Sequence, residues 1–186
     1  YHNLEKTGFN LWDRCQDCDR WTLLTKNNFG HSTLSFNNQL HVADGFAPLR
    51  DFKDGNKPEA SFDLSAVFGG KEAGDIVRRF VKEGSRSLLI EDTFVLNDTA
   101  QELRWQLMTT ARVELQEGVA ILHQDGKSLR MNIQSHPSIY PSVVSLDPPP
   151  LALDRRIPGL KRIEIRFPAY LFDEGAGSIQ ILLTGE

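Results

Sequence analysis

The stretch NNFGHSTLSFNNQLH, residues 27–41, contains two histidines, His31 and His41. His31 directly follows Gly30, and a glycine lets the backbone bend or approach another group closely. A histidine just after such a bend can project from the end of a strand into a cleft, where it acts as an acid, a base or a positive charge near neutral pH. The same spacing fits a histidine on the polar face of a strand, so both interpretations stay open at this point.

A metal site is the second chemistry that this stretch raises. His41 and Asp44, in HVADG, could form a carboxylate–imidazole pair or part of a metal site, with His31 as a third ligand. The spacing of the three residues matches no metal-binding signature. We therefore predict no metal site here and expect solvated loop residues instead.

The two cysteines, Cys15 and Cys18, form a CQDC motif. Such a pair occurs in redox sites and as half of a zinc site, but a zinc site needs two further ligands, and no second C-x-x-C or H-x-x-x-H is present. A thioredoxin-like motif needs a βαβ context, which the sequence lacks. We expect two loop cysteines, either reduced or bridged to each other.

Arg20 and Trp21 precede the short stretch TLLT, residues 22–25. An indole face stacks on the C–H groups of a sugar and a guanidinium pairs with a carboxylate, so this pair could bind an acidic sugar. Trp21 also fits a core tryptophan beside a surface arginine, and core packing is favoured more strongly for Trp105, in ELRWQLM. The sequence has no nucleophile elbow, phosphate-binding glycine loop or paired-carboxylate signature.

Short runs with an apolar–polar period of two dominate the chain and predict the elements that would position these residues. Asn-rich residues 37–39 indicate a turn, and Asp-Gly in QDGKS and the stretch KEGSRS indicate hairpins. Acidic stretches such as IEDT, residues 90–93, are typical of solvated turns. We predict an all-β antiparallel β-sandwich of about a dozen strands in stacked sheets, with little helix. The expected strands are TLLT (22–25), STLSFN (32–37), LHV (40–42), APLRDF (47–52), ASFDLS (60–65), DIVRRFV (75–81), SLLIEDTFVL (87–96), LRWQLMTTARVEL (103–115), GVAILHQ (118–124), SLRMNIQS (128–135), SVVSL (142–146), KRIEIRF (161–167) and SIQILL (178–183).

The totals favour one domain with a partner that is neither a nucleic acid nor a membrane. A chain of 186 residues suits one substantial domain, and its net charge of -4 argues against a nucleic-acid groove or an anionic membrane surface. No apolar run approaches the roughly 18 residues that span a bilayer. Because the sequence begins with Tyr1 and enters structured-looking sequence at once, we interpret residues 1–186 as a single β-sandwich domain cut from a longer chain.

The stretch RWTLLTKNNFGHSTLSFNNQLHV resembles the start of the β-sheet domain of heparinase II/III-like polysaccharide lyases. In that family an Arg-Trp pair precedes a short strand, an Asn-rich turn and a strand that begins Gly-His. The similarity continues less specifically through FAPLRDF, SLLIEDTF, RWQLMTTARVEL, AILHQDGKSL and DPPP, and covers most of the chain. The matching residues are Arg20, Trp21, Asn27, Asn28, Gly30, His31, Ser32, Thr33 and Leu34.

The resemblance implies β-elimination on glycans that contain uronic acid. In that reaction a base removes the C5 proton and an acid protonates the departing O4. A further group neutralises the carboxylate, because the C5 proton beside a bare anion is too weakly acidic. In the family, a histidine of the sheet domain completes a cleft formed with an N-terminal helical toroid, and His31 is the matching position. We predict that His31 is catalytic and that Arg20, Trp21 and Asn28 contact the substrate.

Some family members also hold a zinc ion in the sheet domain through two histidines and an aspartate. His41 and Asp44 are only weak candidates for such ligands, so a structural zinc ion is left out of the prediction. The β-elimination step itself needs no cofactor.

The resemblance also implies partners and a location. The expected partners are an acidic polysaccharide and the chain's own N-terminal helical domain, and the substrate class points to a bacterial protein that is periplasmic or secreted. Since the toroid and its tyrosine are missing, and Tyr1, Tyr140 and Tyr170 match no catalytic motif, we expect the isolated domain to be inactive. The alternative is a non-catalytic carbohydrate-binding or structural β-sandwich. The sequence does not identify the glycan.

Overall fold

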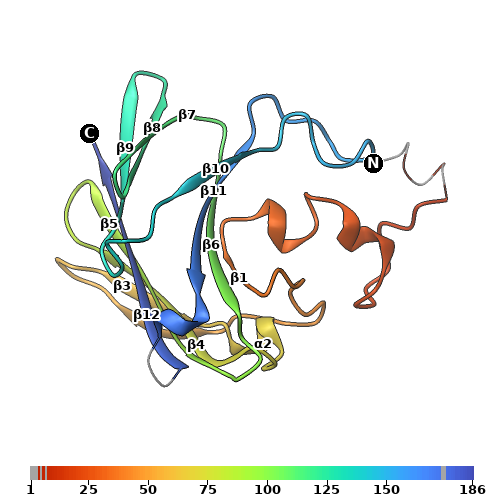
Figure 1. Cartoon of the computed structure of the whole chain (residues 1–186), viewed down its shortest axis with the longest axis horizontal. Coiled ribbons are helices and arrows are strands. Elements are labelled where there is room, and N and C mark those ends of the chain that lie inside the picture. The colour runs from red at the N-terminus through yellow and green to blue at the C-terminus, as the bar shows by residue number, and fades with distance from the viewer. Residues whose placement is uncertain (1–3, 5, 7, 173–174) are drawn as a thin grey trace.

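The computed structural model describes residues 4, 6, 8–172 and 175–186, whose strands form two antiparallel sheets packed face to face (Figure 1). The all-β sandwich predicted from the sequence is confirmed, and helix is limited to short turns. The small sheet has the order β1 (Leu34–Phe36), β6 (Glu102–Thr109), β11 (Lys161–Pro168) and β10 (Ser142–Ser145). The helical turns are η1 (Asp19–Thr22), η2 (Asn28–Gly30), α2 (Ser65–Phe68) and η3 (Ala169–Leu171).

The large sheet contains the other strands, and its central strands β4, β5 and β12 are the longest in the molecule. In sheet order the strands are β2 (Leu49–Lys53), β3 (Glu59–Asp63), β4 (Ala73–Lys82), β5 (Ser87–Leu96), β12 (Ala176–Gly185), β9 (Lys127–Ile133), β8 (Val119–Gln124) and β7 (Arg112–Gln116).

The core lies between the two sheets because alternate residues of each strand point to the same face. Trp105 and Ile165, on neighbouring strands of the small sheet, are buried against Ile90 and Ile181 of the large sheet. The prediction that Trp105 is a core residue is confirmed. Burial of these side chains is the main favourable term that holds the sheets together.

Two predicted turns have the backbone conformation that their residues favour. In the β8–β9 hairpin, Asp125 has φ of 51° and Gly126 has φ of 73°, as an Asp-Gly turn between twisted strands requires. After β1, Asn37 and Asn38 have φ of 48° and 58°, a region that asparagine tolerates better than most residues.

Three predicted strands are wrong in detail. Residues 22–25 form the end of η1 and the turns that follow it, not a strand. Leu23 and Leu24 are both buried, so they do not alternate between two faces as strand residues would. Residues 40–42 form a loop, whose N–H groups donate to the Asn28 side chain and to the carbonyl of Val67 in place of a strand partner. The run 103–115 bends after Thr109 and is divided between β6 and β7, which belong to different sheets.

The stretch 90–93 is also not a solvated turn. It lies within β5, where Asp92 points into the interior and is fully buried against Arg78, with Arg78 Nε 2.7 Å from Asp92 Oδ1. A carboxylate at this depth needs such a partner, because an unpaired buried charge is strongly unfavourable.

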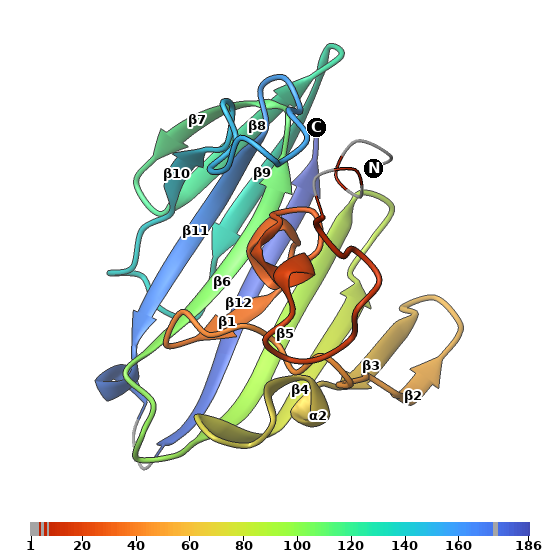
Figure 2. The ribbon, with the colours of Figure 1, turned by 90° about the vertical axis from the view of Figure 1, so that its right-hand side faces the viewer.

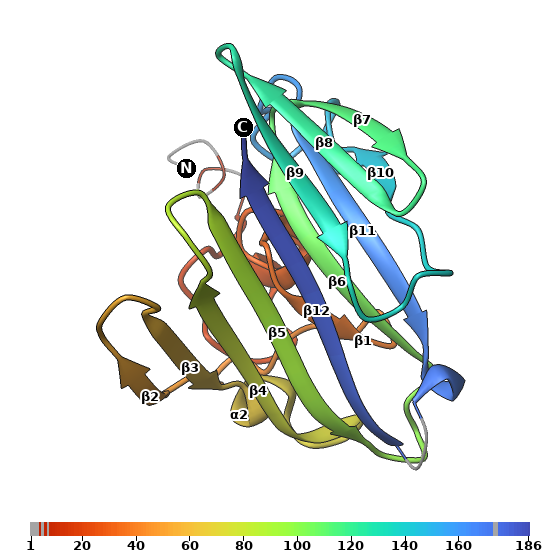
Figure 3. The same cartoon turned by 90° about the vertical axis from the view of Figure 1, so that its left-hand side faces the viewer.

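The N-terminal segment, residues 8–33, lies against the outer face of the small sheet, on the side away from the large sheet (Figures 1 and 2). In Figure 2 this segment, in red and orange, stands in front of the strands. The outer face of the large sheet is not crossed by any other segment of the described chain (Figure 3). No helix among the described residues is long and apolar enough to cross a bilayer.

Candidate functional site

The turn that carries His31 is held in a tight arrangement against the preceding residues. Asn27 caps η2, accepting a hydrogen bond from Phe29 N at 3.0 Å, and its Nδ2 donates to Trp21 O at 3.0 Å. A Cβ atom on Gly30 would lie 1.8 Å from Leu24 O, so only glycine fits at this position. The expectation that Gly30 allows a close backbone approach is confirmed.

His31 is exposed on this turn, and its ring has a defined tautomer when neutral. His31 Nδ1 lies 3.0 Å from Asn27 O. Because a carbonyl oxygen can only accept, Nδ1 carries the proton in that hydrogen bond, and Nε2 is the ring nitrogen with the lone pair. The neutral imidazole therefore presents Nε2 as a proton acceptor.

The His31 turn is anchored to the outer face of the small sheet. Gln106 of β6, fully buried, donates from Nε2 to the carbonyl oxygens of Asn28 and His31. Arg162 of β11 donates from Nη1 to Phe29 O at 2.7 Å. Three carbonyl groups of the turn, those of residues 28, 29 and 31, are thus fixed by two side chains more than 70 residues away in the sequence.

Glu164 supports this anchor from beneath. Its side chain, 1% exposed, accepts from Arg162 Nε at 2.8 Å and from Arg166 Nε at 3.0 Å, and Arg104 lies nearby. Burial would raise the pKa of Glu164, but the hydrogen bond from Arg166 and the charges of Arg162 and Arg104 outweigh it and hold that pKa below its usual value. Glu164 therefore stays ionised and orients Arg162.

Sequence reasoning missed Gln106, Arg162 and Glu164. They alternate with core residues in ordinary strand sequence, which predicts a solvated face. A period of two shows which residues share a face, but no local signal says that a distant segment covers it.

A pocket of about 290 Å³ opens beside His31. It brings together three of the four predicted site residues, His31, Trp21 and Asn28, and adds His41 and Lys26, which were not predicted to contact substrate. Its lining consists of Trp21, Lys26, Asn27, Asn28, His31, Thr33, Leu40, His41, Val42, Ala43, Gly45 and Val67.

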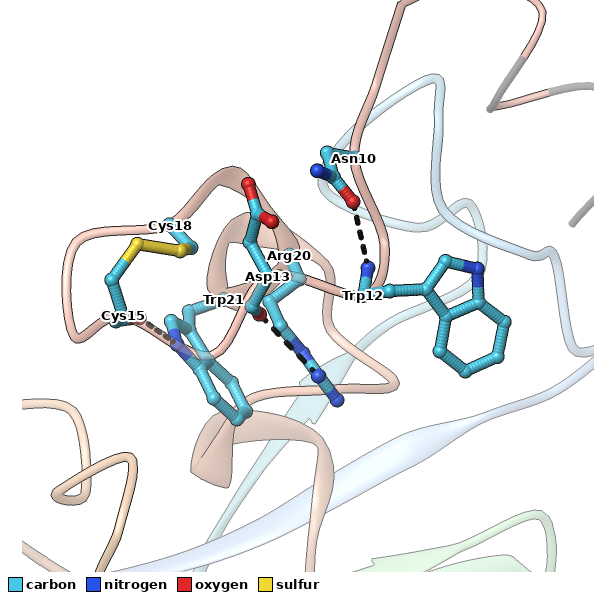
Figure 4. Close-up of a disulfide and its surroundings, with 7 residues drawn as sticks. All are labelled: Asn10, Trp12, Asp13, Cys15, Cys18, Arg20 and Trp21. Carbon is cyan, nitrogen blue, oxygen red and sulfur yellow. Dashed lines mark hydrogen bonds between the residues drawn. A yellow bond between two sulfur atoms is a disulfide. The ribbon is translucent and has the colours of Figure 1, made fainter.

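Arg20, the fourth predicted site residue, is not part of the pocket lining. Its guanidinium carbon lies 4.5 Å from the centre of the Trp21 ring, and its Nη1 donates to Asp13 O at 3.4 Å (Figure 4). Trp21 is half-buried and donates from Nε1 to Cys15 O at 2.8 Å. Arg20 therefore holds the indole from one side by a cation–π contact, while Trp21 itself lines the pocket.

Asn28 lines the pocket as a buried connector. Its Nδ2 donates to Gln39 O at 3.1 Å, and its Oδ1 accepts from His41 N at 3.2 Å. The carboxamide thus ties η2 to the loop 39–41, of which Leu40 and His41 also line the pocket.

His41 is a second imidazole in the pocket wall. Its Nε2 donates to Leu34 O at 2.8 Å, and its ring packs edge-on against Phe68 at 4.8 Å between ring centres. Burial lowers the pKa of His41, the hydrogen bond to Leu34 opposes this, and the charges of His31 and Arg78 lower it further. His41 thus favours the neutral form.

Within the described part of the chain, no group of three or more histidine, cysteine, aspartate or glutamate side chains is arranged to hold a metal ion. Asp44 is exposed and does not line the pocket. The predicted role of His41 and Asp44 as solvated loop residues fits Asp44 but not His41, whose ring is half-buried.

The two tyrosines in the described part of the chain do not line the pocket. Tyr140 and Tyr170 are 59% and 83% exposed and do not contribute to its lining, and Tyr1 lies outside the described residues. Cys15 and Cys18 are joined by a disulfide (Figure 4), which decides between the two states that the sequence left open.

Comparisons with known proteins support the fold. No protein-family model matches the sequence, and neither does any curated protein. Among solved structures, the chain is similar to the heparan sulfate lyase HepC from Pedobacter heparinus, with a TM-score of 0.60 and 15% identity over 83% of this chain and 24% of that chain. It is also similar to a crystal structure of heparinase III, with a TM-score of 0.61 and 8% identity over 86% of this chain and 24% of that one. The resemblance found in the sequence is thereby confirmed for the fold, and the chain spans about a quarter of the length of these proteins.

Proposed function

We propose that this chain is the sheet domain of a polysaccharide lyase that cleaves uronic-acid-containing glycans by β-elimination, with His31 as a catalytic residue. The observation that carries the proposal is the ring of His31: it lies at a pocket, on a fold similar to that of heparan sulfate lyases, with Nε2 available. An imidazole in this state can accept the C5 proton of a uronate.

The remaining pocket residues suit an acidic sugar in different ways. Trp21 offers a half-buried indole face for stacking on a sugar ring, and Arg20 keeps that indole in place from behind. Lys26 adds a positive charge to the lining, which favours a carboxylate. In this proposal Asn28 shapes the pocket through its two backbone hydrogen bonds.

The proposed reaction also needs an acid for O4 and a group that neutralises the carboxylate at the reacting centre. Neither of the tyrosines that the structure describes lines this pocket, and the similar lyases are about four times as long as the matched region. We therefore assign these roles to a helical N-terminal domain of a longer protein and expect the isolated chain to be inactive. A periplasmic or secreted location belongs to the same proposal, and the Cys15–Cys18 disulfide suits an oxidising compartment.

The test is His31→Ala in the protein that joins this chain to its helical domain. Turnover, measured by the absorbance of the unsaturated uronate product on heparan sulfate, chondroitin sulfate and alginate, should fall by about 10²-fold or more. The matched control is His123→Ala on β8, outside the pocket, which should keep its rate. An unchanged rate in His31→Ala, with the fold intact, would favour a non-catalytic carbohydrate-binding domain instead.

A further inference from the structure

The Cys15–Cys18 disulfide closes a short turn that presents one side chain to the pocket loop. The two Cα atoms are 5.2 Å apart, and Cys18 N donates to Cys15 O at 3.3 Å. Gln16 lies inside this turn. Its Nε2 donates to His41 O at 3.0 Å, and its Oε1 accepts from Ala43 N at 2.7 Å.

These two hydrogen bonds resemble those of a neighbouring strand. A carboxamide that donates to one residue and accepts from the residue two positions later pairs with the backbone as an extended segment does. Gln16 therefore fixes both the position and the direction of residues 41–43. His41 and Ala43 are both part of the pocket lining.

The same turn also contacts Trp21, another residue of the pocket lining. Trp21 Nε1 donates to Cys15 O at 2.8 Å (Figure 4), and Trp21 N donates to Cys18 O at 3.1 Å. One disulfide-closed turn thus contacts Trp21 and, through Gln16, the 41–43 loop, and both line the pocket.

The loop 40–45 depends on such contacts because it belongs to no strand. Leu40 and Val42 are partly exposed, and its other backbone bonds run to the Asn28 side chain, to Val67 and within the loop itself. Removing the two hydrogen bonds from Gln16 leaves the loop 40–45 with fewer hydrogen bonds to the rest of the chain.

We propose that the Cys15–Cys18 disulfide and Gln16 form a redox-sensitive clamp that sets the shape of the pocket, with Gln16 as its positioning residue. The clamp rests on the proposed function only for its effect on turnover. Its effect on the pocket itself follows from the contacts of the chain.

Reduction by a dithiol balances without any further reactant. Cys15 is exposed and Cys18 is buried, so a reductant thiolate attacks Cys15 Sγ and Cys18 leaves as a thiolate, which takes up a proton. The second thiol of the reductant then closes its own disulfide and releases Cys15. The protein gains two electrons and two protons, and the dithiol loses them.

Opening the cross-link restores conformational freedom to residues 15–18, so that Gln16 is no longer held opposite the loop. The 41–43 wall then moves more freely, and water reaches the His41 ring. The burial that lowers the pKa of His41 becomes weaker, and that pKa moves up towards its usual value.

The experiment compares the oxidised chain, the chain reduced with dithiothreitol, Cys15→Ser/Cys18→Ser, Gln16→Ala and the control Gln124→Ala, an exposed glutamine on β8 outside this pocket. NMR follows the Trp21 indole N–H signal and the titration of the His41 ring. We expect reduction, the double serine variant and Gln16→Ala to raise the His41 titration midpoint. The double serine variant should not respond to reductant, and Gln124→Ala should match the oxidised chain. Unchanged His41 titration in both the reduced chain and Gln16→Ala would overturn the clamp.

Turnover in the longer protein gives the functional readout. With heparan sulfate as the probe, reduction and Gln16→Ala should each raise KM by about tenfold, as expected for losing two hydrogen bonds that shape a binding pocket, with a smaller effect on kcat. Reduction of the Gln16→Ala variant should add little, because both changes release the same contact. If the NMR signals respond as expected but no variant or wild type yields the unsaturated product, the clamp stands and the lyase proposal fails.

Discussion

The two sheets each carry arginines and carboxylates on their outer face, but in opposite surroundings. On the small sheet, Glu164 is buried and receives hydrogen bonds from Arg162 and Arg166. On the large sheet, Arg79 pairs with Glu91 across neighbouring strands, and its side chain is 41% exposed. The residue types are the same, and the difference is that residues 8–33 cover only the small sheet.

This difference changes what the charged groups do. On the covered face, Arg162 and Gln106 donate to backbone carbonyls of the His31 turn, so the cluster fixes a segment that carries the candidate site. On the open face, the bonds of Arg79 stay within the sheet, and water can replace them. Charged and polar strand residues that are covered by another segment can therefore hold that segment in place, whereas the same residue types on an open face bond only within their sheet.

The largest expected effect is that of Glu164→Ala. It leaves the covered side chains of Arg162 and Arg104, and the half-exposed Arg166, without their central carboxylate, and we expect a loss of about 3–5 kcal/mol in the free energy of unfolding. Urea denaturation measures it. The matched change on the open face, Glu91→Ala, should cost about 1 kcal/mol or less. Equal losses in the two variants would mean that covering the small sheet makes no energetic difference.

A smaller effect is expected for Gln106→Leu, which keeps the size of the side chain but removes its donors. The carbonyl oxygens of Asn28 and His31 then lose a partner in a buried site, at about 1–3 kcal/mol. Hydrogen exchange of the turn amides should accelerate as well. The control is Gln180→Leu on β12, whose amide contacts Glu91 on the open face and should cost less. The comparison breaks if the control variant is the less stable of the two.

The lowered pKa of the half-buried His41 should make the free energy of unfolding depend on pH. Because burial lowers the pKa of His41 below its usual value in the unfolded chain, the unfolded chain takes up a proton first as the pH falls. The free energy of unfolding should therefore decrease as the pH falls through about 6.5 and level off below the folded pKa. His41→Gln should flatten this slope, leaving the part due to His136, whose pKa is also lowered by burial. Denaturant titrations between about pH 5 and pH 8 measure the slope, and an identical slope in both proteins would contradict the assignment.

The smallest expected effect belongs to Arg79→Ala on the open face. Exposed ion pairs contribute about 0.2–1 kcal/mol, and salt screens them. The difference from wild type should shrink further in about 1 M sodium chloride, where the screening length is only about 3 Å. The loss caused by Arg162→Ala should persist at that salt concentration, because this side chain is covered. A salt response of the same size in both variants would remove the distinction between the two faces.

Much of the fold follows from local pattern. The alternation in SLLIEDTFVL gives the bounds of β5 without error, and the Asp-Gly turn at 125–126 places the β8–β9 hairpin. The local pattern predicted the wrong surroundings for residues that pair with a residue far away in the sequence. The carboxylate of Asp92 is acidic and was expected in solvent, yet it pairs with Arg78 in the interior.

The candidate site likewise contains residues that the sequence indicated and residues that it did not. His31 stood out because glycine precedes it, and the close approach of Gly30 to Leu24 bears out the physical reason. Gln16 and Gln106 gave no signal, since a glutamine in a loop or on a strand is ordinary. Their roles come from backbone groups that only the folded chain brings within reach.

The sequence by itself determined that this chain folds as a β-sandwich and that Gly30 allows a close approach of the backbone just before His31, because strand periodicity and glycine geometry act over a few residues. Only the tertiary structure decided which sheet face is covered, which charges are buried, and that His31, His41 and Trp21 share one pocket. These features depend on contacts between residues far apart in the chain, and their free energies come from burial, which a local pattern does not contain.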